Sequence, residues 1–174
     1  MAAFLRFCAL KKFRIITVVL TIALCAFIFS LSHQNSETSS ETSRGLIAKF
    51  VAIFVDDFDE LPLERQKELC APFQFIVRKS AHFSAYFTLG VLSFLSLLTY
   101  DKSLKFKMIS SMAFCFLYSV SDEIHQLFIK GRSGEVRDVI IDTVGAVLGV
   151  LIVCLFLRIK KTGKLSRFVK QRMD

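Results

Sequence analysis

Residues 138–157 read DVIIDTVGAVLGVLIVCLFL, a stretch in which two carboxylates interrupt an otherwise mostly apolar run. About 20 apolar residues are enough for a helix to cross the hydrocarbon core of a bilayer. Asp138, Asp142, Gly145 and Gly149 follow the spacing i, i+4, i+7, i+11, so they share one face of such a helix. A small-residue face lets two membrane helices approach closely. We therefore expect a transmembrane helix whose Asp142 points at a neighbouring helix and not at lipid.

Three further apolar runs lie at about residues 15–31, 81–100 and 106–126. The chain is 53% hydrophobic with a mean hydropathy of +0.53, whereas a soluble domain is about 45–50% apolar. Basic residues precede the first run, as in a signal peptide. That run is long for a signal peptide, however, and no clear cleavage site follows it, so we expect an uncleaved anchor. The predicted fold class is all-α, a single domain over residues 1–174 built as a polytopic membrane bundle of four transmembrane helices.

A long loop over residues 32–79 joins the first two predicted spans. Residues 35–44 are rich in Ser, Thr and Glu and are typical of an exposed loop. Residues 45–55 place apolar side chains at i, i+1, i+4, i+5, i+8 and i+9, which predicts a short amphipathic helix. It is too short to span a bilayer, so we expect it to lie in the interface or to pack on the bundle. Pro62 and Pro72 are expected to bracket a separate short polar helix around residues 64–69.

The charges are distributed unevenly between the loops. The N-terminus, the loop near residues 100–107 and the tail over residues 158–174 together carry 14 basic and two acidic residues. The loops 32–79 and 122–137 together carry nine basic and 11 acidic residues. The positive-inside rule then predicts that both termini are cytoplasmic and that the two other loops face outward. The net charge of +8 is accordingly read as a topology signal, and no nucleic-acid partner is expected.

The five cysteines are scattered along the chain without any CxxC pair. This pattern favours neither a disulfide framework nor a zinc site, and we expect small packing residues. No metal and no cofactor is predicted.

Ionisable residues from three of the predicted helices converge on one level near the outer face. This follows from measuring each helix from its cytoplasmic end with about 20 residues per crossing. The candidate binding residues are Arg78, Lys79, His82, Tyr86, Asp122, Glu123, His125, Gln126, Arg132, Asp138 and Asp142.

Such a cluster leaves three chemistries open. Arg78, Lys79 and Arg132 suit recognition of an anionic headgroup, with the acids holding them in place. Asp122 and His125, at i and i+3, offer a weak metal-binding signal, because no HExxH motif is present. Acid–base hydrolysis would use His82 or His125 as base and Asp142 as the orienting group. No nucleophile motif accompanies them, so the sequence leaves open whether the protein is an enzyme.

Structural roles are also compatible with these residues. Arg78 and Lys79 suit snorkelling anchors at a helix end. Asp138 suits an acid in the first turn of a helix, where it complements the helix dipole. Asp142 suits a buried ion pair in an accessory structural subunit.

Three motifs resemble the signature of the VanZ-like family. They are RKSAHFSAYFTLG (78–90), SDEIHQLF (121–128) followed by GRSG (131–134), and DVIIDTVG (138–145). Their order and spacing fit, and the resemblance covers about residues 15–157.

The resemblance implies a multi-pass protein of a bacterial plasma membrane with a role in the cell envelope. The namesake of the family is associated with resistance to the glycopeptide antibiotic teicoplanin without a change in the D-Ala-D-Ala target. The expected partners are the lipid bilayer and an anionic envelope lipid or lipoglycopeptide. The protein would bind or modify this ligand; a lipid-headgroup hydrolase or transferase is the alternative.

Overall fold

The computed structural model of the chain describes residues 2–35, 44–45, 47–55 and 57–173, with side chains for 10–35, 44–45, 47–55 and 57–158. All regular structure within these residues is helical, so the all-α prediction is confirmed. The elements are the long helices α1 (Ala2–Ser32), α3 (Leu63–Leu97), α4 (Leu104–Gln126) and α5 (Val136–Met173), with the short 3-10 helix η1 (Phe58–Glu60).

Three of the helices are long and apolar enough to cross a membrane. They are Leu10–Ser32 of α1, the whole of α3, and Val136–Arg158 of α5. Helix α4 is not among these candidate spans; it carries several serines, and Asp122 and Glu123 lie near its C-terminal end. By length and composition, three spans of the four predicted are therefore present in the described residues.

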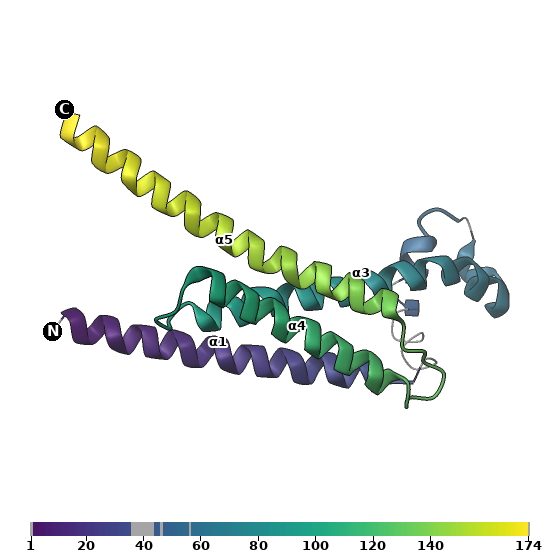
Figure 1. The fold of residues 1–174 in the computed structure, drawn as a ribbon. Helices are drawn as coiled ribbons and strands as arrows, with labels where there is room; N and C mark the ends of the chain where they lie inside the picture. Colours follow the sequence, from purple (N-terminus) through teal and green to yellow (C-terminus); the bar gives the residue numbers. More distant parts are fainter. Residues whose placement is uncertain (1, 36–43, 46, 56, 174) are drawn as a thin grey trace.

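The helices lie lengthwise beside one another (Figure 1). Both termini and the α3–α4 turn lie at one end of the bundle. The opposite end, called the loop end below, holds the α4–α5 loop (residues 127–135), the end of α1 and the outer part of α3. The three strongly basic segments thus share one end, as the charge counts predicted.

Helices α3 and α5 form the closest pair in the bundle. A Cβ built on Gly145 would lie 2.6 Å from the Phe83 carbonyl oxygen, and one on Gly149 would overlap the Phe87 carbonyl. Gly90 of α3 meets the Ala146 carbonyl in the same way. The predicted close approach at the glycine face of α5 is confirmed, and it brings Asp138 and Asp142 against α3.

Helix α4 buries its polar face and exposes its apolar face. Its buried residues, spaced along one side, are Ser111, Cys115, Ser119, Asp122, Glu123 and Gln126. Large apolar side chains on the other side are exposed, among them Ile109, Leu117 and Ile124. This is the reverse of a water-soluble helix and is the pattern expected of a helix in lipid.

The predicted break at Pro72 is wrong. The expected short helix around residues 64–69 and the second span form one continuous helix, α3, with Pro72 inside it. Proline removes one backbone hydrogen bond and crowds the carbonyl four residues earlier, here that of Glu68. Glu68 and Pro72 are both exposed, and a carbonyl on the exposed side of a helix can be satisfied by its surroundings, so the helix continues through the proline.

The segment before η1 packs against α3. Residues 47–51 are helical, and buried Ile47 and Val51 contact Phe58 and Cys70. Ile53 and Phe54 are each 74% exposed. Leu46, Asp56 and residues 36–43 lie outside the described residues, so the amphipathic helix as a whole and the exposed loop stay predictions.

Candidate functional site

A small polar cavity of about 100 Å³ lies at the loop end of the bundle. Its wall comes from α3, the last turn of α4, the α4–α5 loop and the first turn of α5. The lining residues are Arg78, Lys79, His82, Gln126, Gly131, Arg132, Ser133, Glu135 and Asp138. Six of the eleven predicted binding residues therefore line one cavity.

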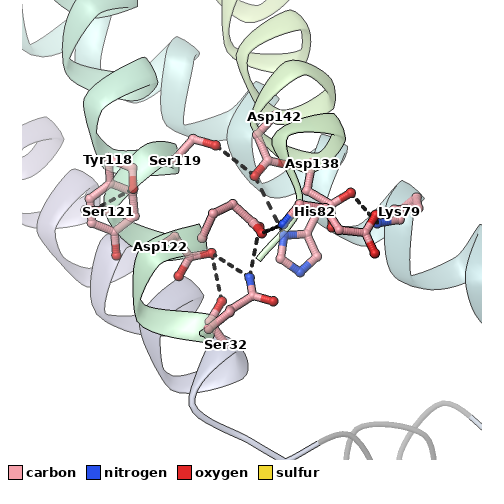
Figure 2. A network of polar contacts seen from close by, with 12 residues as sticks. Ser32, Lys79, His82, Tyr118, Ser119, Ser121, Asp122, Asp138 and Asp142 are labelled. Carbon is pink, nitrogen blue, oxygen red and sulfur yellow. Dashed lines mark hydrogen bonds and ion pairs between the residues drawn. The ribbon is translucent and has the colours of Figure 1, made fainter. Parts of the chain in front are cut away.

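A largely buried ion pair closes the α3–α5 side of this polar cavity. Lys79 pairs with Asp138, and its Nζ lies 3.8 Å from Glu135 Oε2 (Figure 2). The side chains of Lys79 and Asp138 are 12% and 15% exposed, so solvent screens their attraction only weakly. The pair holds the start of α5 against α3.

His82 stands between the cavity and a buried carboxylate. Its Nδ1 lies 3.9 Å from Oδ2 of Asp142, which is fully buried. The same Asp142 oxygen accepts a hydrogen bond of 3.1 Å from Ser119 Oγ on α4 (Figure 2). Because the two imidazole nitrogens lie on different edges of the ring, Nε2 of His82 points away from Asp142.

Hydrogen bonds between side chains form the α1–α4 side. Asp122 Oδ2 accepts from Ser32 Oγ at 2.8 Å and from Gln126 Nε2 at 3.4 Å. Gln126 Nε2 also donates to Glu123 Oε1 at 3.0 Å. The second Glu123 oxygen accepts from the backbone N–H of Glu135 at 2.9 Å. Asp122 and Glu123 do not line the cavity, but their hydrogen bonds hold Gln126 and the α4–α5 loop in position.

Arg132 ties the α4–α5 loop to the end of α1. Its Nε donates to the Gln34 carbonyl at 2.8 Å, and Nη2 donates to the Leu31 carbonyl at 2.9 Å. Its Nη1 donates to Gln126 Oε1 at 3.3 Å. Leu31 lies in the last turn of α1 and Gln34 just beyond it, so the guanidinium sits at the C-terminal end of a helix, where a cation is favourable.

Two guanidinium groups, those of Arg78 and Arg132, line the polar cavity. Among the described residues, no carboxylate forms an ion pair with the exposed Arg78. Burial lowers the pKa of the Arg132 guanidinium, and the nearby positive charge of Arg78 lowers it further. This mutual repulsion would be relieved by an anion held between the two groups.

Two predicted binding residues lie away from the cavity. Tyr86 is fully buried in a core cluster with Leu89 and Cys115. His125 stacks on Phe29, with ring centroids 4.4 Å apart, and its Nε2 lies 3.2 Å from His33 Nδ1. Since His125 faces α1 and not Asp142, His82 is the histidine that the bundle brings to the polar cavity.

The sequence analysis did not single out Ser32, Ser119, Gln34 or Glu135. A signal for Ser119 existed, because it continues the buried polar face of α4 that includes Asp122. Gln34 contributes a backbone carbonyl, and the identity of a side chain gives no indication of such a contact.

The polar network is not fully paired. Asp122 and Asp142 each keep one buried carboxylate oxygen without a hydrogen-bond partner among the described residues. No group of three or more His, Cys, Asp or Glu side chains within that part of the chain could hold a metal ion. The arrangement combines a cationic rim, one imidazole and an acidic back wall, which together can hold a small anionic group and exchange a proton with it.

The fold and site define a class: a helical membrane protein with a polar cavity at one end of the bundle. The VanZ/LLP1 family model matches residues 17–157, and the chain belongs to this family. No curated protein and no solved structure shows a significant match.

Proposed function

We propose that this protein binds the anionic headgroup of an envelope lipid, or of a lipidated ligand, in the polar cavity at its loop end. The observation that carries the proposal is the pair of guanidinium groups, Arg78 and Arg132, on one cavity of about 100 Å³. Arg78 has no ion pair among the described residues, so its charge is available to a ligand. A phosphate or carboxylate between the two would form charge-assisted hydrogen bonds.

The topology that goes with this proposal has four transmembrane helices and both termini in the cytoplasm of a bacterium. The polar buried face and apolar exposed face of α4 support a fourth span, despite the modest hydropathy of this helix. The clustering of basic segments at one end supports the orientation. The cavity then opens near the outer leaflet, where envelope lipids and lipoglycopeptides are encountered.

A purely structural role for the cluster is less well supported. A purely structural cluster of ion pairs should leave no charge without a partner, because an uncompensated buried charge is costly. Here Arg78 is unpaired among the described residues and lines the polar cavity. These features favour a site that completes its interactions with a ligand.

Lipid binding in nanodiscs tests the proposal. The full chain is placed in phosphatidylcholine nanodiscs with a small fraction of phosphatidic acid, and retained lipid is counted by native mass spectrometry. We expect Arg78→Gln to reduce phosphatidic acid retention about tenfold. Arg65→Gln is the matched control, since it removes the same charge from an exposed Arg65–Glu68 pair on the same helix. Equal retention by both variants would contradict the proposal.

Resistance to teicoplanin is tested in a sensitive Gram-positive host that expresses the chain, with membrane levels checked by immunoblot. Protection by the wild type that Arg78→Gln and Asp142→Asn both lose would link the cavity to the antibiotic. Good expression without protection would leave lipid binding standing and remove the link to glycopeptides.

A second candidate is a hydrolase or transferase acting on the bound headgroup. The position of His82 favours it, because the imidazole lines the cavity while its Nδ1 faces Asp142 at 3.9 Å. This is the arrangement in which a carboxylate orients a general base. Release of inorganic phosphate from phosphatidic acid in the same nanodiscs tests the idea. Turnover that His82→Ala abolishes, with lipid retention intact, would support catalysis; no turnover by the wild type would exclude this reaction.

A further inference from the structure

An apolar groove runs beside the polar cavity on the outside of the bundle. It lies between α4 and the start of α5 and has a volume of about 410 Å³. Its walls include Phe116, Val120, Ile124, Val136, Val139 and Ile140. The groove begins at the loop end, where Gly134 and Glu135 line it, and extends along α4 as far as Phe116.

The last turn of α4, the α4–α5 loop and the first turn of α5 form the wall between the groove and the polar cavity. Gly131, Arg132 and Ser133 line the cavity, whereas Gly134 lines the groove, and Glu135 contributes to both. The chain therefore passes from one wall to the other within five residues.

The partition between the two spaces is thin because Gly134 packs directly on α4. A Cβ at this position would lie 2.6 Å from the Glu123 carbonyl oxygen and 3.0 Å from the Leu127 side chain. Any other residue would push the loop away from α4. The glycine thus keeps the groove and the cavity adjacent.

We propose that the α4–α5 groove holds the hydrocarbon chain of the same amphiphile whose anionic headgroup occupies the polar cavity. The inference rests on the proposed function and adds the ligand class, a membrane amphiphile with one anionic head and a long chain. A cationic cavity and an apolar groove on the two sides of one loop match the two parts of such a molecule. The first carbons of the chain cross the loop rim beside Glu135, and the rest of the chain lies along α4 toward the middle of the bundle.

A second apolar cavity provides a control. It has a volume of about 340 Å³ and lies between α1, α3 and α4, with Val18, Ile22 and Phe114 in its wall. Its lining shares no residue with the polar cavity. A lipid chain that enters any apolar surface groove would label both sites, whereas a chain anchored by its headgroup would label only the α4–α5 groove.

The test uses a photoreactive alkyl phosphate with a diazirine in the middle of its chain. The full-length protein is placed in phosphatidylcholine nanodiscs, irradiated with the probe, and mapped by mass spectrometry. We expect labelling on residues 116–127 and 136–140. Val139→Phe and Val120→Phe, which fill the groove, should reduce this labelling at least fivefold, and Val18→Phe should leave it unchanged.

The headgroup is tested separately with inorganic phosphate. If phosphate binds but Val139→Phe and Val18→Phe reduce alkyl phosphate labelling of the groove to the same extent, the groove inference fails while the proposed function stands. Labelling spread evenly over α1 and α4 would overturn the inference in the same way. If phosphate does not bind and labelling of the groove is insensitive to Arg78→Gln, both the proposed function and the inference are wrong.

Discussion

The α3–α5 pair and the α1–α4 pair hold the two sides of the polar cavity by different means. Helices α3 and α5 touch backbone to backbone at Gly90, Gly145 and Gly149. Helices α1 and α4 lie farther apart and meet through side chains, as where Tyr118 donates to the Cys25 carbonyl at 2.6 Å. The first pair has no room for adjustment, whereas the second can shift by changing rotamers.

This difference assigns separate roles to the two sides of the site. The rigid α3–α5 side carries Lys79, His82 and Asp142, the groups whose relative positions matter for handling a proton. The α1–α4 side supplies Arg132 through a loop that is held to α1 and to the last turn of α4 by hydrogen bonds of Arg132 and Glu135. A ligand that enters the cavity would therefore move the Arg132 side more than the His82 side. Four substitutions test the comparison.

The largest effect is expected at the glycine seam, the close contact of α3 and α5 at Gly90, Gly145 and Gly149. Gly149→Leu would place a side chain against the Phe87 backbone, and neither helix can yield without losing the Gly145 contact. We expect a loss of more than about 4 kcal/mol, seen as little folded protein after detergent extraction. Gly45→Leu is the control, because open space surrounds the Cβ position at Gly45. Normal thermal unfolding of Gly149→Leu would show that the seam is not rigid.

The Lys79–Asp138 pair comes next. Lys79→Met should destabilise the protein by about 3 kcal/mol, because it leaves the carboxylate of Asp138 buried without its partner. The double variant Lys79→Met/Asp138→Leu should recover most of this loss, as measured by thermal unfolding in detergent. A double variant no more stable than the single one would mean that the pair does more than compensate charge.

A smaller effect is expected for the loop anchor. Arg132→Lys keeps the positive charge but removes the planar guanidinium, whose Nε and Nη2 donate to the Gln34 and Leu31 carbonyls at the same time. We expect about 1–2 kcal/mol of local destabilisation, detected as faster amide hydrogen exchange at the end of α1. Exchange in the α3–α5 seam should be unchanged. Equal acceleration at the seam would contradict the division into a rigid and an adjustable side.

The smallest effect concerns Tyr118. Tyr118→Phe removes one hydrogen bond to the Cys25 carbonyl and should cost about 0.5–1 kcal/mol in thermal unfolding. Tyr100→Phe, at an exposed tyrosine near the other end of the bundle, is the matched control. A cost for Tyr118→Phe as large as that of Lys79→Met would mean that α1 and α4 are as tightly coupled as α3 and α5.

The glycine face and Asp142 could be predicted because the helical period alone fixes which residues share a side. The same logic places Tyr118, Asp122 and His125, at i, i+4 and i+7, on one face of α4, and all three face α1. The prediction failed at Pro72, where we expected the proline to end a helix and α3 continues through it. The presence of a proline alone does not say whether the helix side it lies on is exposed, and Pro72 is exposed.

The cavity itself could be predicted only in part. Charged residues at a common depth indicated Arg78, Arg132 and Asp138, since a membrane penalises charges elsewhere. The separation of His82 from His125 depends on which neighbouring helix each meets, and the sequence does not specify helix packing. The contacts of Arg132 with the end of α1 could not be predicted from side-chain identities, because their acceptors are the backbone carbonyls of Leu31 and Gln34.

The central claim is that Arg78 and Arg132 bind one anion in the polar cavity. The most direct measurement is a titration of inorganic phosphate into the purified full-length protein in a neutral detergent, followed by calorimetry, for the wild type, Arg78→Gln and Arg65→Gln. The account predicts saturable binding of one phosphate per chain, weakened at least tenfold by Arg78→Gln and unchanged by Arg65→Gln. Absence of binding, or equal weakening by both substitutions, would contradict it.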